Sequence, residues 1–479
     1  MVETEGIPLL TRFEVKFKMK LRIYDTFKRA KVDFTPNNSS HVKIYVCGPT
    51  VYDFAHIGNA RPVIIFDVLV RLLRHLYPKV TYVRNITDID DKINARSLET
   101  GESINLITDR TTRAFEEDMS ALNSQKPDYE PRATDHVEEM KGLIKILIEK
   151  KHAYEINKHV LFSVSSMAEY GQLSRLNKRE LLAGARIDVA PFKQDPQDFV
   201  LWKPSDQKTP GWDSPWGRGR PGWHIECSAM SQKYLGDAFD IHGGGQDLIF
   251  PHHENEIAQS KCALGSSAFA KYWMHNGYLM TEGSKMSKSL GNFYTVRDLL
   301  KDFPGEAIRF LLLKTHYRQP LDFTKRGLRE AKTELDRLYR VLQNFNTPSL
   351  SLQEVKPPFD DALLDDLNSP LAITKLHKIS SQLNKGMSDK KKNVLICQLL
   401  SYGKVLGLLQ SDPQEWFQWQ PNSQKSQELD KNTIERMILA RTKARETKNF
   451  NESDKIRDQL LVAGIILEDN KKGTSWRRQ

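Results

Sequence analysis

The sequence predicts an α/β protein whose main domain is a parallel sheet, interrupted by an insertion and followed by a helical bundle and a small basic C-terminal module. Three observations lead to this fold class. A buried strand, a turn and a helix follow one another near the N-terminus, a second such pattern begins near residue 222, and helical periodicity dominates beyond residue 305. Strands that alternate with helices form parallel sheets, whereas successive helices pack into bundles.

The first strand, turn and helix surround the stretch from Cys47 to Arg61, Cys-Gly-Pro-Thr-Val-Tyr-Asp-Phe-Ala-His-Ile-Gly-Asn-Ala-Arg. β-branched and aromatic residues at 43–46 predict a buried strand, and apolar residues at helical spacing predict a helix over 61–76. Open α/β sheets bind ligands at such turns, because backbone N–H groups at the helix start point toward an incoming phosphate. His56 and Asn59, three residues apart, add two side-chain donors to that face.

A second strand is predicted over 81–87, which completes a β-α-β unit and therefore a parallel sheet. The acidic residues that follow, between Asp88 and Lys92, have two interpretations. They could bind a metal ion, or they could be solvated or cap the next helix, which are the commoner roles of carboxylates at a strand end.

Residues 105–221 read as an insertion between two halves of the sheet, because the pattern becomes helical and then mixed and rich in turns. Near its end, the run Gly217 to Gly222 predicts a flexible basic loop. Arg218 and Arg220 in this loop could be solvated, or they could meet a phosphate backbone.

The second half of the sheet is predicted from residue 222 onward. A strand over 239–247 ends in three glycines, which we expect to form a turn, and Pro251 marks the start of a helix. A further strand and turn over 272–278 precede a loop that carries two lysines, Lys285 and Lys288.

The remainder of the chain is predicted to be mainly helical, over 307–315, 326–344 and 361–410. A Ser/Pro-rich linker at 345–358 and a polar linker at 411–431 separate these segments. The last 49 residues contain twelve Lys and Arg against seven Asp and Glu, which is half of the net charge of +10. Such a balance favours a polyanionic partner.

Composition excludes two classes of protein. No apolar run approaches the roughly 18 residues that a membrane-spanning helix needs, so we expect no membrane association. Four scattered cysteines are too few for a disulfide framework, which is typical of a protein from the reducing cytoplasm. Residues 1–20 lack the features of a targeting peptide, and we expect translation to start naturally at Met19.

Four residues far apart in the sequence suit a zinc ion. Cys47 and Cys227 are each expected beside the sheet, and His252 and Glu256 share one helical face because they are four residues apart. Two thiolates, an imidazole and a carboxylate are zinc ligands. Two alternatives remain open: the cysteines could be small buried apolar groups, and His253 could replace His252. Cys262 and Cys397 have no such neighbours and are assigned to packing.

The residues His56-Ile57-Gly58-Asn59 resemble the His-Ile-Gly-His signature of class I aminoacyl-tRNA synthetases, and Lys285-Met286-Ser287-Lys288-Ser289 resembles the second signature of that class. Asn59 departs from the pattern and is assigned a positioning role, because its amide does not titrate. Six motifs occur in the order typical of bacterial cysteinyl-tRNA synthetases, from about residue 20 to the end of the chain. They are Cys-Gly-Pro-Thr-Val-Tyr-Asp, Gly-Trp-His-Ile-Glu-Cys-Ser, Ile-His-Gly-Gly-Gly, Phe-Pro-His-His-Glu-Asn-Glu, Lys-Met-Ser-Lys-Ser and the C-terminal Gly-Ile-Ile-Leu-Glu-Asp with Gly-Thr-Ser-Trp-Arg-Arg.

This resemblance implies a Rossmann-like fold and a two-step reaction, in which ATP activates L-cysteine and the adenylate then esterifies tRNA(Cys). It implies zinc bound by Cys47, Cys227, His252 and Glu256, with one position left for the substrate thiolate, so that serine is rejected without an editing domain. Mg²⁺ is expected on the ATP phosphates. We expect a cytoplasmic monomer whose residue Trp476, beside two arginines, stacks on anticodon bases.

The resemblance assigns the remaining site residues and the domain boundaries. The catalytic residues are His56, Asn59, Lys285 and Lys288, and the ATP-binding residues are His56, Asn59, Gly243, Gly244 and Lys288. The cysteine-binding residues are Trp223, Thr87 and Asp247. The expected segments are an extension (1–20), the first half of the sheet domain (21–104), the insertion (105–221), the second half (222–284), the second signature with a stem-contact region (285–344), the helical bundle (345–430) and an anticodon-binding module (431–479).

Four other functions fit part of the sequence. A ligase that transfers cysteine to a small amine would share the site but lack the C-terminal module. A zinc deaminase would need a Pro-Cys-x-x-Cys motif, and a lipase would need a Gly-x-Ser-x-Gly motif; the sequence contains neither. A protein that only binds RNA would not need the two phosphate signatures.

Overall fold

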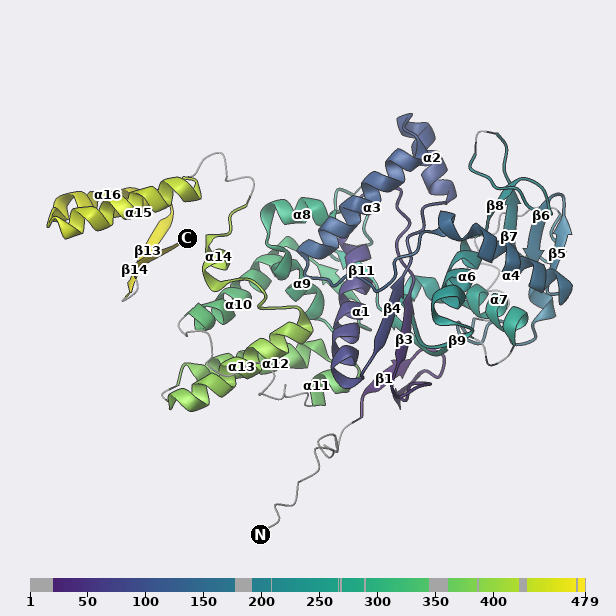
Figure 1. Ribbon diagram of the computed structural model, residues 1–479, viewed down its shortest axis with the longest axis horizontal. Helices are drawn as coiled ribbons and strands as arrows, with labels where there is room; N and C mark the ends of the chain where they lie inside the picture. Colours follow the sequence, from purple (N-terminus) through teal and green to yellow (C-terminus); the bar gives the residue numbers. More distant parts are fainter. Residues whose placement is uncertain are drawn as a thin grey trace, which may run out of the picture.

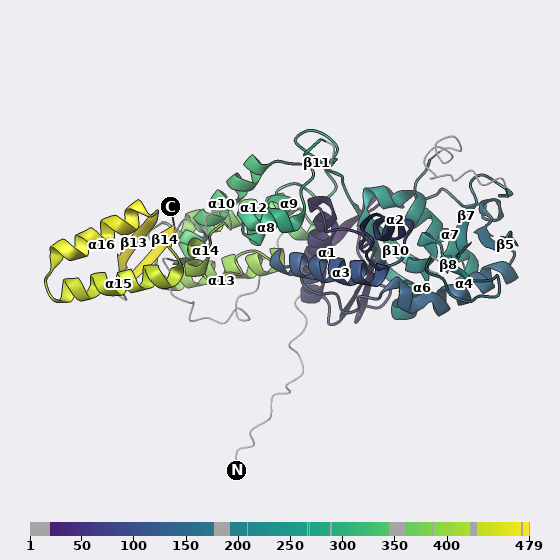
Figure 2. The same cartoon turned by 90° about the horizontal axis from the view of Figure 1, so that it is seen from above.

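The computed structural model describes most of the chain, and Figures 1 and 2 show an elongated molecule with the parallel sheet near its middle. The described residues are 20–176, 192–207, 209–265, 267, 269–287, 290–343, 361–385, 387–421, 429–470 and 473–478. Met19, the linker predicted at 345–358 and Lys288 lie outside these residues, so the predictions for them stay predictions.

The central sheet has four parallel strands in the order β10-β9-β3-β4. These are β3 (Val42–Val46), β4 (Val80–Arg84), β9 (Ala238–Gly245) and β10 (Phe269–Asn276). Strands β3 and β9 are neighbours at the centre, and the chain leaves them toward opposite edges of the sheet. Ligands of open α/β sheets bind where the strand order reverses in this way. The predicted parallel sheet is confirmed.

Helix α1 (Ile57–Leu76) follows β3 and packs against the sheet. It begins four residues before the predicted start, so that His56 stands at its N-terminus. A methyl group on Gly243 would lie 2.3 Å from the ring of Phe66 in α1, so only glycine permits this helix-to-strand spacing. The three glycines at 243–245 do not form the predicted turn; they continue strand β9.

Helices α2 (Asp91–Thr100) and α3 (Ile104–Ala121) lead out of the first half of the sheet. The acidic residues before α2 have structural partners: Asp90 caps the helix by accepting from the Lys92 N–H at 2.7 Å, and Asp88 accepts from the Thr134 N–H and hydroxyl. The capping interpretation is therefore confirmed over the metal-binding one.

The insertion forms a second, antiparallel sheet that the sequence did not predict (Figure 1). Its elements are η1 (Ala133–His136), α4 (Val137–Glu149), β5 (Ala153–Ile156), β6 (His159–Phe162), η2 (Val164–Ser166), β7 (Phe199–Pro204) and β8 (Gly219–Pro221). The predicted flexible loop is wrong at β8, because Arg220 is buried and pairs with Asp91. Arg218 donates to backbone carbonyls of its own loop.

The second half of the main domain carries the helices around the sheet, and a helical region follows it. These elements are α6 (Trp223–Leu235), η3 (Gln246–Leu248), η4 (Ile249–His253), α7 (Glu254–Leu264), β11 (Leu279–Thr281), α8 (Val296–Asp302), α9 (Gly305–Leu313), β12 (Leu321–Phe323), α10 (Lys325–Gln343), α11 (Asp361–Leu364), α12 (Ser369–Leu383), α13 (Asp389–Leu406) and α14 (Pro413–Gln418). The predicted polar linker at 411–431 is wrong in its first part. There Trp416 of α14 is buried against Tyr339 and donates to Asp336.

Asp366 links the helical region to the first strand of the chain. It is fully buried, and its carboxylate accepts from the Tyr24 N–H in β1 (Arg22–Asp25) at 2.8 Å, from the Tyr317 hydroxyl and from Arg318. Strand β1 pairs with β2 (Ala30–Asp33) beside the main sheet. The helical region is therefore bonded directly to the first strand of the chain.

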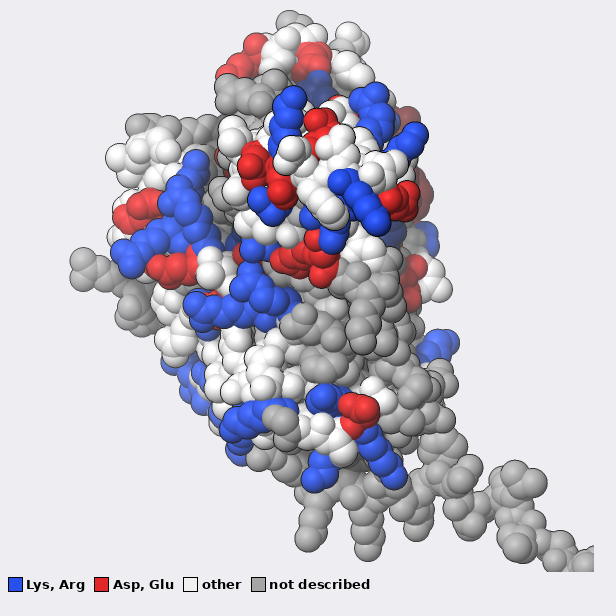
Figure 3. All heavy atoms as spheres, turned by 90° about the vertical axis from the view of Figure 1, so that its left-hand side faces the viewer, with Lys and Arg blue, Asp and Glu red and all other residues white. Residues whose placement is uncertain are grey.

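The C-terminal module consists of α15 (Lys431–Glu446), α16 (Phe450–Val462), β13 (Ile465–Asn470) and β14 (Gly473–Arg478). Trp476 is only 5% exposed and packs in the core of the module with Ile434, Ile456 and Leu460. The prediction that Trp476 stacks on anticodon bases is therefore wrong. Figure 3, which views this end of the molecule, shows groups of Lys and Arg side chains among acidic ones. Among the described helices, none combines the length and apolar composition that crossing a bilayer requires.

Candidate active site

The four residues predicted as zinc ligands converge at the carboxyl end of strands β3 and β9. Cys47 directly follows β3, Cys227 lies in the first turns of α6, His252 is the penultimate residue of the short segment η4, and Glu256 lies in the first turn of α7. Their donor atoms all lie within 4.8 Å of one another. The loop after β3 and three separate helical elements thus bring these side chains to one point at the end of the sheet.

The distances between the donor atoms suit tetrahedral zinc. The sulfurs of Cys47 and Cys227 are 3.7 Å apart, Cys47 Sγ is 3.4 Å from Glu256 Oε1, and His252 Nε2 is 3.0 Å from that oxygen. Ligand bonds of about 2.0 to 2.3 Å at tetrahedral angles place neighbouring donors roughly 3.3 to 3.8 Å apart. The two distances from Cys47 lie in this range, and the distance between His252 and Glu256 is slightly shorter. The two sulfurs are too far apart for a disulfide.

A second set of donors shares two of these residues. His242 and His253 each bring Nε2 to Cys47 Sγ, at 3.4 and 3.3 Å, and Cys47, His242, His253 and Glu256 also meet the geometric limits of a metal site. The spacing-based alternative of His253 for His252 therefore stays open on geometry alone. The first set offers zinc two thiolates, and the second offers one.

The burial of these residues is unfavourable without a cation. Burial is the largest cause that raises the pKa of both the Cys47 and the Cys227 thiols, and Glu256 raises them further. Glu256 Oε2 is buried and makes no hydrogen bond among the described residues. A divalent cation would favour the thiolates and satisfy the carboxylate, so the residues present fit a zinc ion.

Two contacts between histidine pairs orient the candidate ligands His252 and His253 through the ring nitrogen that does not face the metal site. His224 Nδ1 lies 2.9 Å from His252 Nδ1, and His253 Nδ1 lies 2.7 Å from His275 Nε2, whose other nitrogen contacts the Thr26 hydroxyl. A second hydrogen bond fixes the tautomer and the ring plane of a metal-binding histidine. The sequence analysis assigned no role to His224 or His275, although His224 belongs to the motif Gly-Trp-His-Ile-Glu-Cys-Ser.

Trp223, the first residue of α6, lies against this cluster. Its ring stacks on His252, with centroids 4.2 Å apart, and it lines a cavity of about 480 Å³ between the main domain and the insertion. His224 and Glu226 line the same cavity. The four candidate ligands are not among the residues that line this cavity, and Trp223 is in contact with both the cavity and His252.

Thr87 and Asp247 occupy different positions. The Thr87 hydroxyl is buried and donates to Glu226 at 3.1 Å, one residue before Cys227. Burial raises the pKa of Glu226 well above its ordinary value. Asp247, in the segment η3 after β9, is exposed, and its carboxylate lies beside Gly245. Among the residues that the structure describes, no hydrogen bond or ion pair joins Asp247 to the four ligands.

The first signature lies at the N-terminus of α1. The backbone N–H of His56 donates to Asn59 Oδ1 at 3.1 Å, so Asn59 holds the helix start with its oxygen and keeps its Nδ2 group as a donor. Burial lowers the pKa of His56 to about 4, which makes its imidazole neutral near pH 7. The site therefore offers hydrogen-bond donors and the helix dipole, without a charged histidine.

The second signature lies against the first. The Ile57 N–H donates to the Tyr294 carbonyl at 3.0 Å, and His56 contacts Phe293 with ring centroids 5.4 Å apart. A methyl group on Gly58 would lie 3.5 Å from Met286 Cε. Lys285, just before Met286, is exposed, and Lys288 is not described. The structure thus brings the two signatures together.

Gly243 and Gly244 lie in the same part of the sheet, but their packing gives them another role. Both are buried within β9, and a methyl group on Gly244 would lie 2.9 Å from His253. Glycine is therefore required here by close packing, whether or not ATP approaches. A contact of either residue with ATP stays a prediction.

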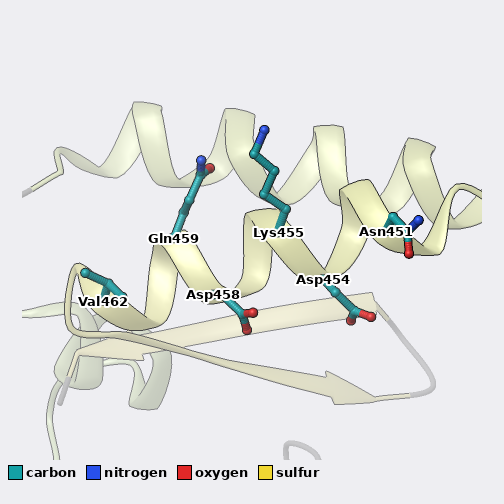
Figure 4. A pocket seen from close by; sticks show the side chains of 6 residues that line it. All are labelled: Asn451, Asp454, Lys455, Asp458, Gln459 and Val462. Atoms are coloured by element: carbon teal, nitrogen blue, oxygen red, sulfur yellow. The ribbon is translucent and has the colours of Figure 1, made fainter.

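A second hollow, of about 650 Å³, lies on the C-terminal module at the far end of the molecule from the sheet (Figures 1 and 4). Its lining comes from helix α16 alone. Figure 4 shows Lys455 and Gln459 on one side of the helix and Asp454 and Asp458 on the other. These side chains do not converge on one point, so we assign no site to this hollow.

Comparison with known proteins identifies the family. The family model "tRNA synthetases class I (C) catalytic domain" matches residues 33–333. A cysteine–tRNA ligase from Paramagnetospirillum magneticum is 57% identical over 464 residues, which cover 96% of this chain and 100% of the relative. A second, from Rhodospirillum rubrum, is 56% identical over 460 residues, with the same coverage. The chain belongs to the cysteine–tRNA ligase family.

Two further models match this member of the cysteine–tRNA ligase family: a DALR domain over residues 358–410 and a "Cysteinyl-tRNA ligase anticodon binding domain" over 431–477. The fold is also that of more distant class I enzymes. A methionyl-tRNA synthetase from Mycobacterium tuberculosis, 15% identical, has a TM-score of 0.52 and aligns over 77% of this chain and 89% of its own. An arginyl-tRNA synthetase from Campylobacter jejuni, 14% identical, also gives 0.52, over 79% and 95%. The ligase is therefore a class I aminoacyl-tRNA synthetase, as the two signatures predicted.

Proposed function

We propose that this ligase activates L-cysteine with ATP and transfers it to the 3′ end of tRNA(Cys). The observation that carries this proposal is the meeting of two thiols, an imidazole and a carboxylate beside an aromatic-walled cavity. A site with soft donors selects a substrate thiolate over a hydroxyl, because zinc binds sulfur much better than a neutral alcohol oxygen.

We infer that Cys47, Cys227, His252 and Glu256 hold the zinc ion. Two observations support this set over the one with His242 and His253. It supplies two thiolates rather than one, and His252 contacts Trp223, which lines the cavity that a substrate would enter, whereas the His242 ring is stacked between Tyr45 and Trp273. When bound, the zinc ion would lower the pKa of the substrate thiol.

The chain itself supplies the pocket and its polar groups. Trp223 forms the wall that faces His252, and Thr87 holds the Glu226 carboxyl next to Cys227. Asp247 carries a carboxylate at the edge of the sheet that suits the ammonium group of the amino acid. The cysteine carboxylate would then approach the turn between β3 and α1, where the phosphates of ATP bind.

ATP would lie against the two signatures. His56 and Asn59 at the start of α1, together with Lys285 and Lys288, would stabilise the negative charge that develops on the phosphates, with Mg²⁺ bound to ATP itself. Gly243 and Gly244 would border the nucleotide where β9 ends. The carboxylate attacks the α-phosphate in line and pyrophosphate leaves, so no protein nucleophile is required.

The tRNA would span the long axis of the molecule. The basic module at 431–479 would bind the anticodon, the region 285–344 would contact the stem, and the insertion at 105–221 would lie beside the acceptor end. We propose that the enzyme acts as a monomer in the cytoplasm, where reduced thiols at Cys47 and Cys227 are maintained.

Charging of total bacterial tRNA with labelled cysteine and ATP tests this function, with serine as the control amino acid. We expect ester formation with cysteine alone. Release of pyrophosphate that depends on cysteine but never yields charged tRNA would instead favour a ligase that acts on a small amine. A variant that lacks residues 429–479 should keep cysteine-dependent pyrophosphate exchange and lose most tRNA charging, because the catalytic residues lie outside the deleted module.

A further inference from the structure

The loop that carries the second signature is held by the side chain of one buried residue, Asn292. Its Oδ1 accepts a hydrogen bond from the Ser287 backbone N–H at 2.8 Å. Its Nδ2 group donates to Ser284 Oγ at 2.9 Å and to two carbonyls, those of Thr281 at 3.2 Å and Lys285 at 3.3 Å. Asn292 is 7% exposed. One amide therefore fixes the backbone on both sides of Met286.

The backbone around this amide is shaped to bring the loop back on itself. Glu282, Gly283 and Gly291 have positive φ angles of 53°, 74° and 67°. The Thr281 N–H donates to the Ser284 carbonyl, and the Ser284 N–H donates to the Thr281 carbonyl. The resulting turn brings the Thr281 carbonyl and the Ser284 hydroxyl to the Asn292 side chain. The sequence alone does not reveal this arrangement.

The residues that follow Asn292 contact the first signature directly. Phe293 lies against the His56 ring, the Tyr294 carbonyl accepts from the Ile57 N–H, and Thr295 pairs with His56 across an antiparallel bridge. Asn292 therefore stands between the segment that carries Lys285 and the segment that supports the start of α1.

We propose that Asn292 is the positioning residue that aligns the second signature with the first for the activation step. It touches neither ATP nor cysteine in this role. It holds the backbone at Lys285 and Ser287 at a fixed distance from His56, so that the loop needs no reordering when charge develops on the phosphates. This inference rests on the proposed function.

The test compares two steps of the reaction in the full-length variant Asn292→Ala. We expect kcat for cysteine-dependent exchange of pyrophosphate into ATP to fall roughly tenfold or more, because alignment acts in the transition state. The KM for cysteine and the single-turnover transfer of cysteine from preformed adenylate to tRNA should stay within about threefold of wild type. A residue with a merely structural role would lower both steps together with the thermal stability.

Two further variants make the result decisive. Ser284→Ala removes one acceptor of the same amide, and its effect on kcat should not add to that of Asn292→Ala, because both disrupt one network. Asn368→Ala removes the cap of α12, which accepts from the Leu371 N–H, and serves as a control that lowers stability without changing kcat. Unchanged exchange in Asn292→Ala, or an equal loss of both steps, would overturn the inference. Absence of exchange in the wild-type enzyme would overturn the proposed function itself.

Discussion

Trp223 and His252 lie ring against ring, with centroids 4.2 Å apart and 20° between the ring planes. One ring is a wall of the cavity, and the other belongs to a candidate zinc ligand. We therefore propose that recognition of the amino acid and the geometry of the metal site are coupled through this single contact.

Removal of the Trp223 ring should weaken cysteine binding. We expect Trp223→Ala to raise the KM for cysteine about tenfold in pyrophosphate exchange, because an aromatic contact of this kind contributes roughly 0.5–1.5 kcal/mol beyond its buried area. Trp223→Phe keeps a stacked ring and should recover most of the loss. The zinc content of both variants should match wild type; a KM that stays constant in Trp223→Ala would remove Trp223 from the pocket.

The two candidate metal sets make opposite predictions for single variants. If Cys227 is a ligand, Cys227→Ser should lose most of the bound zinc, whereas His253→Gln should retain it. Elemental analysis of the purified proteins measures this directly, without reference to activity. X-ray absorption should also find two sulfur neighbours at about 2.3 Å in the wild-type enzyme, since the alternative set contains only one thiolate. Retained zinc in Cys227→Ser, with loss in His253→Gln, would assign the site to the second set.

The neutral state of His56 predicts a pH profile. Its pKa in the folded protein is lowered to about 4, below the ordinary value of 6.5, so the imidazole carries no charge above pH 6. The folded state binds this proton less readily than the unfolded state, and its stability relative to the unfolded state therefore decreases as the pH falls from about 6.5 toward 4.

We expect the pH profile of the activation rate to have the same shape in the wild-type enzyme and in the variant His56→Gln, with no inflection near pH 6.5 that is due to His56. The measurement is kcat for pyrophosphate exchange between pH 5.5 and 8.5 in both proteins. His56→Gln keeps a side-chain donor and should lower kcat uniformly across this range. A wild-type inflection near 6.5 that vanishes in the variant would show that His56 titrates with an ordinary pKa.

Trp476 should stabilise the C-terminal module rather than contact tRNA. We expect Trp476→Ala to destabilise the module by about 3–5 kcal/mol, because a large buried ring leaves a cavity in a small core. Amide hydrogen exchange should then increase in α15, α16 and the β13–β14 hairpin but not in the main sheet. Loss of tRNA binding with unchanged hydrogen exchange would instead indicate a direct contact of the indole.

The sequence revealed the candidate metal site well, because Cys47, Cys227 and Glu256 belong to residue types that carry chemistry and stand in motifs of fixed order. It did not reveal packing between distant segments. The sequence suggested that Gly243 belongs to a turn. In the structure, glycine is required there by the ring of Phe66, which stands 177 positions earlier in the chain and could not be identified as a neighbour from the sequence. Trp476 had the neighbours of a nucleic-acid contact, and only the surrounding apolar residues show that it is buried.

The insertion shows a second limit. Strands β5, β6 and β8 have only three or four residues each, which is too short for a clear alternation of apolar and polar positions. Their pairing depends on partners up to 42 positions away, as between Val160 and Trp202. Helices such as α10, with 19 residues, gave an unambiguous pattern, and their prediction is confirmed.

Asp366 imposes an order on the folding of this chain during its synthesis. The Tyr24 N–H in the first strand finds its acceptor in a carboxylate 342 positions later, and the Tyr317 hydroxyl and Arg318 guanidinium bind the same group. While the ribosome is still making the sheet, that acceptor does not yet exist. The N-terminal hairpin can therefore reach its final hydrogen bonding only after three quarters of the chain has been translated, and a truncated chain that ends before residue 366 leaves its first strand unfinished.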